Sequence, residues 1–232
     1  MRIAIVGNGK MGKLVSALAV ERGHRIHTVV DSSDNEGGRA LTPERLSGAE
    51  VAIEFTRPDA VVTNLERLIA LGIPTVTGTT GWTEALPRIS ALLEEQKSAL
   101  LHAPNFSVGV HLFLHTAREL ARRCRGHPEF DDSIVEEHHA AKLDAPSGTA
   151  LLLQRQLTAE DPSRRFPITS VRVGAVPGTH TLTYNGPYET ITLSHVARSR
   201  QTFAAGALAA AEWLPGRTGI FTFEDMLFGE TV

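Results

Sequence analysis

A glycine-rich turn near the start of the chain constrains its fold more than any other feature. The turn Gly7-Asn8-Gly9-Lys10-Met11-Gly12 directly follows an apolar run, Ile3–Val6, and opens a helical pattern. An acidic residue, Asp31, ends the next apolar run. A strand, a Gly-x-Gly-x-x-Gly turn, a helix and an acidic residue at this spacing are typical of a dinucleotide-binding βαβ unit. The turn therefore predicts a parallel sheet covered by helices.

The residues of this turn have separate expected roles. Gly7 would allow the tight turn, Gly9 would let the backbone approach the pyrophosphate, and Gly12 would let the helix pack on its strand. The helix N-terminus would stabilise the phosphate charge. The alternative is a glycine turn that caps a helix and binds nothing. We expect cofactor contacts from the whole turn, namely Gly7, Asn8, Gly9, Lys10, Met11 and Gly12.

Asp31 bears on the choice of cofactor. Its carboxylate would accept hydrogen bonds from both ribose hydroxyls and would repel a 2′-phosphate. Ser32 and Ser33 follow it where an arginine would favour NADPH. We therefore expect NADH to be preferred. NADPH stays open as the alternative, because Arg39 or Lys10 could reach a 2′-phosphate.

Two later loops follow predicted strands, at the sheet edge where ligands of α/β proteins collect. Gly78-Thr79-Thr80-Gly81 offers small side chains and hydroxyls to a nicotinamide ribose. Ala103-Pro104-Asn105-Phe106 offers an amide and an aromatic edge. Each loop alone is compatible with an ordinary turn. Their equivalent positions in successive βα units favour cofactor contacts from Gly78, Thr79, Thr80, Ala103, Pro104, Asn105 and Phe106.

Apolar patterning divides the chain into two regimes. The first hundred residues alternate short apolar runs with helical stretches, which is typical of parallel βαβ units. The strands expected there are Ile3–Val6, Ile26–Val30, Val51–Phe55, Thr75–Thr77 and Leu100–His102. The helices expected between them are Lys10–Arg22, Asp59–Leu71 and Thr83–Lys97.

From residue 108 the pattern changes. A long helix, Val108–Arg125, precedes the extended segments, a further helix is expected to start at Ser147, and an alanine-rich helix, Gln201–Leu214, follows. The extended segments expected are Asp132–His139, Ser170–Val176, Thr179–Tyr184 and Glu189–Ala197. We predict an α/β protein with a Rossmann-like dinucleotide-binding domain (residues 1–107 and 200–232). The second domain (108–199) is expected to be α+β with a mostly antiparallel sheet and to serve substrate binding and oligomerisation.

Composition excludes several function classes. A net charge of −3 gives no basic field for nucleic acid. The single cysteine, Cys124, cannot form an internal disulfide and suits a reducing cytoplasm. No apolar run approaches membrane-spanning length, and the first residues fit a strand rather than a secretory leader. We expect a cytoplasmic protein without nucleic-acid or membrane partners.

The segment from Glu136 to Ala150 carries the expected chemistry. A histidine at His138 or His139 suits proton delivery near pH 7, and Lys142 supplies positive charge for an anion. Ser147 is a good N-cap, so the backbone N–H groups of the following Gly148 and Thr149 would lack helical partners. Such a helix start can bind a carboxylate or phosphate. The alternative is that Ser147 only caps a helix and the histidines sit on a polar edge.

The same segment argues against a metal. Adjacent residues on a strand point to opposite faces, so His138 and His139 are not expected to chelate one ion together. Cys124 is the sole thiol, and it lies among Arg122, Arg123 and Arg125. These charges could lower its pKa, although a solvated helix end is the expectation we favour. We predict no metal site.

The segment His138-His139-x-x-Lys142-x-Asp144-Ala145-Pro146-Ser147-Gly148-Thr149-Ala150 resembles the motif of the dihydrodipicolinate reductases. These are the 4-hydroxy-tetrahydrodipicolinate reductases of bacterial lysine and diaminopimelate synthesis. The resemblance covers nearly the whole chain. Other matching segments, in the family's order, are Gly7–Gly12, Glu54-Phe55-Thr56, Gly78–Gly81, Asn105–Gly109, Gly178-Thr179-His180, His195 and Ser199-Arg200.

The resemblance implies a reaction and roles for individual residues. His138 would protonate substrate carbon after hydride transfer, and Lys142 would hold the substrate and assist. His139 would contact the substrate, while Ser147, Gly148 and Thr149 would form the carboxylate-binding helix start. The family reduces a cyclic, unsaturated dicarboxylate with NADH or NADPH and forms homotetramers through the sheet domain. Departures are modest: Ala140-Ala141 replace a frequent basic residue, and Glu54 stands where aspartate is common.

Two other function classes are weighed against this reductase. An amino-acid or aldehyde dehydrogenase could use the same cofactor domain, but aldehyde chemistry usually needs a placed cysteine, which Cys124 does not resemble. An NAD-sensing regulator would need a DNA-binding or partner-docking element, and the sequence holds no basic recognition helix.

Overall fold

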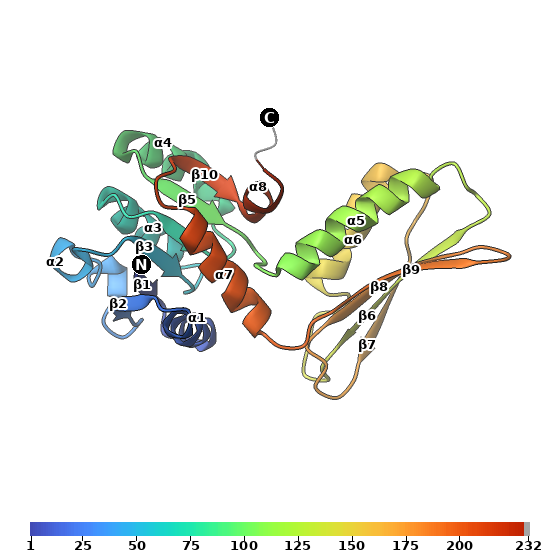
Figure 1. Cartoon of the computed structure of the whole chain (residues 1–232), viewed down its shortest axis with the longest axis horizontal. Helices are drawn as coiled ribbons and strands as arrows, with labels where there is room; N and C mark the ends of the chain where they lie inside the picture. The colour runs from blue at the N-terminus through green and yellow to red at the C-terminus, as the bar shows by residue number, and fades with distance from the viewer. Residues whose placement is uncertain (230–232) are drawn as a thin grey trace. The chain divides into compact units, whose positions relative to one another are not determined.

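The computed structural model describes residues 1–229 and divides into two compact units (Figure 1). The first unit joins Met1–Ser107 to the described residues from Gln201 onward, and the second unit is Val108–Arg200. The chain thus re-enters the first unit after Arg200, one residue later than the bound of 199 drawn from the sequence. What each unit binds stays a prediction. Within residues 1–229, no helix combines the length and the apolar character that crossing a lipid bilayer requires.

The described part of the first unit contains a six-stranded sheet in which every paired strand is parallel. Its strand order is β10-β5-β4-β3-β1-β2. The expected Rossmann-like parallel sheet is therefore confirmed. The strands are β1 (Arg2–Val6), β2 (Arg25–Val30), β3 (Val51–Glu54), β4 (Thr75–Thr77), β5 (Ala99–His102) and β10 (Gly219–Thr222).

Helices cover both faces of this sheet, because alternate residues of each central strand are apolar on opposite sides. Ile3 and Ile5 of β1 join the core formed with α1 and α7, whereas Ala4 and Val6 join the core on the α3 side. All four side chains are fully buried or nearly so. The helices of this unit are α1 (Lys10–Glu21), α2 (Pro43–Leu46), α3 (Val61–Ala70), α4 (Leu86–Gln96), α7 (Gln201–Trp213) and α8 (Phe223–Phe228).

Helix α7 packs closely against α1 and the segment after β5, and its small residues permit this approach. Ala204, Ala207, Ala210 and Ala211 are fully buried. A Cβ added at Gly206 would lie 1.8 Å from the carbonyl oxygen of Phe106, so only glycine fits there. The alanine-rich composition of this helix therefore follows from the short distance to its neighbours.

The second unit is built on a four-stranded sheet with the order β7-β6-β8-β9 (Figure 1). Strands β6 and β8 and strands β8 and β9 pair antiparallel, and β6 and β7 pair parallel, which confirms a mostly antiparallel sheet. Helices α5 (Val108–Cys124) and α6 (Gly148–Glu160) pack on the face that carries Ile134, Leu182 and Tyr184. The strands are β6 (Asp131–His138), β7 (Ile168–Arg172), β8 (Thr179–Asn185) and β9 (Thr190–Val196).

Three expected segments differ from the structure by more than one residue, and further elements were not expected. Helix α3 begins at Val61 rather than Asp59, and the predicted helix Thr83–Lys97 is a 3₁₀ turn followed by α4, in which Lys97 is the left-handed C-cap. Strand β7 ends at Arg172 because Gly174, with φ +52°, turns the chain. Strand β10 and helix α8 were not predicted. β10 is four residues long and offers too short an apolar pattern to stand out.

Cys124 also differs from its expected setting. The thiol is buried in the core of the second unit rather than solvated at a helix end. Burial raises the pKa of this thiol, and the nearby guanidinium of Arg164 does not reverse the effect. A buried thiol of raised pKa is not an activated nucleophile. The aldehyde dehydrogenase alternative therefore loses its one candidate residue.

Candidate active site

Two of the three glycines in the turn between β1 and α1 lie too close to backbone atoms to carry a side chain. Gly7 has φ +103°, and a Cβ there would stand 2.1 Å from the carbonyl oxygen of Phe55. A Cβ at Gly12 would stand 1.9 Å from the carbonyl oxygen of Gly7, so this glycine lets α1 approach the end of β1. A Cβ at Gly9 would meet nothing within 4 Å. The space beside Gly9, the N-cap of α1, is open to a ligand.

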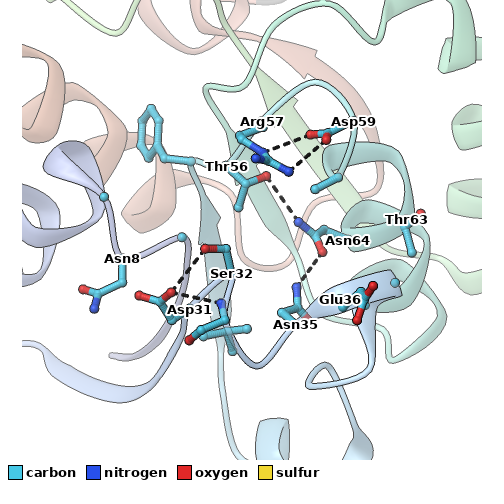
Figure 2. Close-up of a pocket in the computed structure, with 18 residues that line it drawn as sticks. Asn8, Asp31, Ser32, Asn35, Glu36, Thr56, Arg57, Asp59, Thr63 and Asn64 are labelled. Atoms are coloured by element: carbon cyan, nitrogen blue, oxygen red, sulfur yellow. Dashed lines mark hydrogen bonds and ion pairs between the residues drawn. The ribbon is translucent and has the colours of Figure 1, made fainter.

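A cavity of about 640 Å³ opens beside this turn (Figure 2). Gly7, Asn8 and Gly9 line one side, and Asp31 lies at the end of β2. The Asp31 carboxylate accepts hydrogen bonds from the Ser33 amide at 3.1 Å and the Ser32 hydroxyl at 3.3 Å. The Ser33 amide, followed by the Asn8 side chain, lowers the pKa of Asp31, so this partly exposed carboxylate is ionised near neutral pH.

A chain of polar side chains that was not predicted lines the opposite wall of the cavity (Figure 2). Asn64 of α3 donates to the Thr56 hydroxyl at 3.3 Å, and Asn35 donates to the Asn64 side-chain oxygen at 2.9 Å. The Asn35 oxygen in turn accepts the amide of Ala40 at 3.1 Å. Glu54, fully buried at the end of β3, accepts from Thr56, from Thr77 and, at 3.4 Å, from Asn64. These bonds fix the loops after β2 and β3 to each other.

Gly12 lines neither of two cavities in this unit, and the other predicted cofactor residues separate into these two cavities and a third group. Lys10 and Met11 line a smaller cavity of about 420 Å³ together with Gly78, Thr79 and Thr80. The amide of Thr56 donates to the Thr79 hydroxyl at 2.9 Å, which joins the two loops.

The third group is the loop after β5. Ala103 and Phe106 are buried in the core, Pro104 is exposed, and Asn105 accepts the Ser107 amide. None of Ala103, Pro104, Asn105 and Phe106 lines either of these two cavities.

A second cluster forms at the end of β6 in the other unit. Glu136 and His138 are two residues apart and lie on the same face of the sheet, where Glu136 is fully buried and His138 is 9 % exposed. Nδ1 of His138 hydrogen-bonds to a carboxylate oxygen of Glu136. Register places His180 of β8 directly opposite Glu136, and the two imidazole rings meet edge to face with centroids 5.3 Å apart.

The start of α6 joins this cluster. The Ser147 amide donates to Oε1 of Glu136 at 3.2 Å, and its hydroxyl oxygen caps the helix by accepting the Ala150 amide at 3.2 Å. Gly148 is exposed and Thr149 half-buried. Within the described chain, the backbone amides of Gly148 and Thr149 have no hydrogen-bond partner. These are the two free N–H groups expected at a helix start that binds an anion.

Two cationic side chains border the cluster. Nζ of Lys142 lies 2.6 and 2.7 Å from the two carboxylate oxygens of Asp144. Arg172 of β7 donates to Oε1 of Glu136 at 2.7 Å and to the carbonyl oxygen of Asp144 at 2.6 Å. His139, half-buried just past the end of β6, accepts the Lys142 amide through its carbonyl oxygen at 3.0 Å. The structure thus brings His138, His139, Lys142 and the start of α6 to one end of the sheet.

The electrostatics of the cluster distinguish the two histidines. Burial lowers the pKa of His138, while hydrogen bonding to Glu136 and its charge oppose that effect. Burial, together with the charge of His138, lowers the pKa of His180 to about 4, so His180 is neutral at pH 7. Burial alone would raise the pKa of Glu136, but hydrogen bonds from Arg172, Ser170, His138 and the Ser147 amide lower it to about 2.

The cluster has the donor atoms of a metal site, but both carboxylate oxygens of Glu136 are already engaged in hydrogen bonds. Ligand atoms of Glu136, His138 and His180 lie within 4.8 Å of one another. Oε1 of Glu136 is occupied by a guanidinium and an amide, and Oε2 by His138. The Arg172 charge also opposes a second cation at this carboxylate. The arrangement therefore favours proton transfer beside an anion site, and the absence of a metal stays a prediction.

No site role was predicted for three members of this cluster. Glu136, Arg172 and His180 lie on three strands, and only the sheet register brings them together. Glu136 carried one usable signal, because it stands two residues before His138 on an expected strand and so shares its face. Arg172 carried no local signal that could have been used.

Comparisons with known proteins identify relatives for both units. The family model "Dihydrodipicolinate reductase, N-terminus" matches residues 1–106, and "Dihydrodipicolinate reductase, C-terminus" matches residues 109–227. A 4-hydroxy-tetrahydrodipicolinate reductase of Christiangramia forsetii is 36 % identical over 98 % of both chains. The corresponding enzyme of Thiobacillus denitrificans is 35 % identical, also over 98 % of both chains.

A solved structure has the same fold. The chain is similar to the dipicolinate-bound dihydrodipicolinate reductase from Paenisporosarcina sp. TG-14, with a TM-score of 0.82 and 24 % identity. The match covers 98 % of this chain and 99 % of that one.

Because Gly9 and Gly12 have different surroundings, we predict that a substitution at Gly9 affects cofactor binding and one at Gly12 affects stability. Gly9→Ala should leave the melting temperature unchanged, because its Cβ meets nothing, yet weaken dinucleotide binding about tenfold or more by blocking close backbone approach. Gly12→Ala should lower the melting temperature, since overpacking costs about 1–3 kcal/mol. Thermal unfolding and calorimetric titration with NADH would measure the two effects. Equal losses of stability in both variants would contradict this assignment.

Proposed function

Because this chain belongs to the dihydrodipicolinate reductase family, we propose that one unit binds the cofactor and the other binds the substrate of a single reduction. The protein is an NAD(P)H-dependent oxidoreductase that reduces 4-hydroxy-tetrahydrodipicolinate in lysine and diaminopimelate biosynthesis. The first unit holds the dinucleotide at the turn Gly7–Gly12 and Asp31. The second unit holds the dicarboxylate and supplies the proton.

One observation carries the second half of this proposal. The carboxylate of Glu136 contacts both the imidazole of His138 and the amide of Ser147. A proton donor and two unpartnered helix-start amides therefore occupy one cluster within a single unit. A dicarboxylate of the kind named in the Paenisporosarcina structure needs such an arrangement, with N–H donors and positive charge for its carboxylates and an acid beside its ring.

The proposed chemistry adds a hydride to one carbon of a conjugated unsaturation and a proton to the next. The nicotinamide cofactor supplies the hydride when it is bound. His138 donates the proton from Nε2, the ring nitrogen that Glu136 leaves free. Gly148 and Thr149 donate their amides to one substrate carboxylate. Lys142 supplies positive charge and assists proton transfer, and His139 contacts the substrate.

Removing the imidazole tests the acid role. His138→Ala should lower kcat by about 10²–10⁴-fold, the usual contribution of a placed general acid, while NADH affinity stays nearly unchanged. NADH absorbance would be followed with freshly generated condensation product of aspartate semialdehyde and pyruvate. His127→Ala, which removes an exposed histidine of the same unit, serves as the control. Unchanged turnover in His138→Ala would remove the proposed acid.

We further propose that NADH is preferred over NADPH. The ionised Asp31 faces the cavity and would repel a 2′-phosphate. Arg39 and Lys10, the two cationic residues considered as possible partners of a 2′-phosphate, are both placed elsewhere. Arg39 donates to the carbonyl oxygen of Asp34 at 3.1 Å and lies 3.9 Å from Glu36, and Lys10 lines the smaller cavity. The charged group expected beside the adenosine ribose is therefore the negative carboxylate of Asp31.

Replacing this carboxylate should change the preference. Asp31→Asn should raise the ratio of kcat/KM for NADPH to that for NADH by about fivefold or more, because a like-charge contact at 4 Å costs about 1 kcal/mol even in water. Glu50→Gln, which removes an exposed carboxylate of the same unit outside the cavity, should leave the ratio unchanged. A ratio that does not move in Asp31→Asn would count against the assignment.

The sheet of the second unit supports a homotetramer. Its face opposite α5 and α6 carries small and β-branched side chains such as Thr181 and Ser194, whose hydroxyls are 3.0 Å apart, and Val196, which is 60 % exposed. A sheet face that carries such side chains can pack against the sheet of another subunit. We propose a cytoplasmic compartment, which suits the unpaired thiol of Cys124.

Light scattering would test the assembly. The chain mass is 25.1 kDa, and the proposal expects about four times that mass in solution. A monomer at all accessible concentrations would contradict it.

A further inference from the structure

Glu136 is a buried carboxylate with a partner on each oxygen. Oε2 contacts Nδ1 of His138, and Oε1 accepts both Nη2 of Arg172 at 2.7 Å and the Ser147 amide at 3.2 Å. Its side chain is fully buried, and Arg172 is 18 % exposed. An ionised carboxylate in such a setting persists because both of its oxygens accept hydrogen bonds from protein donors in place of water.

We propose that Glu136 is a positioning residue, which sets the proton-bearing nitrogen of His138 and at the same time anchors the substrate-binding start of α6. This inference rests on the proposed function, because it explains how the proton donor and the carboxylate-binding site of that function are held in place relative to each other. Glu136 itself is buried behind the two groups and is not expected to touch substrate.

The first step of the argument concerns the tautomer of His138. An ionised carboxylate only accepts hydrogen bonds, so Nδ1 of His138 carries a proton. The transferable proton is then the one on Nε2. That nitrogen points toward Gly178, where an added Cβ would stand 3.0 Å away and where φ is +153°. Glycine at this position therefore leaves room in front of the nitrogen that must face the substrate.

The second step concerns His180, which lies close enough to compete for the same role. The Ser147 hydroxyl oxygen accepts the Ala150 amide, so its hydrogen is free to be donated to Nε2 of His180, 3.2 Å away. An accepting Nε2 requires a neutral imidazole, in keeping with a pKa of about 4 for His180. The network therefore leaves His138 as the single acid of the pair.

The third step concerns charge. The groups that face His138 are Glu136 on its own strand, His180 on β8, Arg172 on β7 and Lys142 in the loop that follows, with Asp144 paired to Lys142. Glu136 is the one that raises the pKa of His138, against burial and the two cations. Without its charge, His138 would lose its proton at a lower pH.

Glu136→Gln is the decisive variant, because it keeps the shape and removes the charge. With NADH saturating, kcat/KM for the dicarboxylate should fall about tenfold or more, since a wrong tautomer is costly in comparable carboxylate–histidine pairs. Activity that requires protonated His138 declines as pH rises through its pKa. This decline should begin at lower pH in Glu136→Gln than in the native enzyme, and affinity for NADH should be unchanged.

A matched control is available in the same unit. Glu129→Gln removes the carboxylate of another histidine–glutamate pair two residues apart, in which Nδ1 of His127 lies 3.0 Å from Glu129 and both side chains are about half exposed. Its kcat/KM and pH profile should match those of the native enzyme. A Glu136→Gln variant with a lower melting temperature but a native pH profile and near-native kcat/KM would show a structural role only and would overturn the proposal.

Two further comparisons close the test. If Glu136→Gln does not fold, Glu136→Asp replaces it; a carboxylate one methylene shorter cannot reach all three partners, so kcat/KM should still fall, and a native value would overturn the proposal. The outcomes also separate the two claims. Loss of activity in His138→Ala with native activity in the Glu136 variants would refute this inference alone. Native activity in His138→Ala would refute the proposed acid role itself.

Discussion

The geometry of the candidate site depends on one buried charge. Glu136 lies at the end of β6 without access to water, and an unpaired carboxylate there would be strongly destabilising. Its partners come from β6 itself, from β7 and from the start of α6. Satisfying one carboxylate therefore fixes the imidazole of His138 and the free amides after Ser147 in a single arrangement, and strand register places neutral His180 beside them.

The proposed binding surfaces of the two units depend on different physical constraints. In the first unit the constraint is steric: Gly7 and Gly12 bring the end of β1 and the start of α1 into contact distances that no side chain would permit, and Gly9 leaves open space. In the second unit the constraint is electrostatic, and it is distributed over elements far apart in the sequence. Substitutions in the first should act mainly through shape, and those in the second through charge and protonation.

This difference explains how much the sequence could predict. The parallel sheet, the glycine turn and the cap at Ser147 depend on local patterns, so they could be predicted. Arg172 could not, because its role depends on the pairing of β6 with β7, which no local pattern specifies. Burial of Cys124 was missed for the same reason: the flanking arginines indicated a solvated helix end, whereas the chain that packs over the thiol comes from distant segments.

The central claim is that His138 and the start of α6 act on one ligand as a unit. Nuclear magnetic resonance can follow the imidazole nitrogens of His138 and the amides of Gly148 and Thr149 while dipicolinate is titrated into the NADH-loaded protein. The account predicts that all of these signals shift with one dissociation constant, with Nδ1 of His138 protonated throughout. The account would be contradicted if the amide signals shifted while those of His138 did not. It would also be contradicted if, before dipicolinate is added, His138 carried its proton on Nε2 alone.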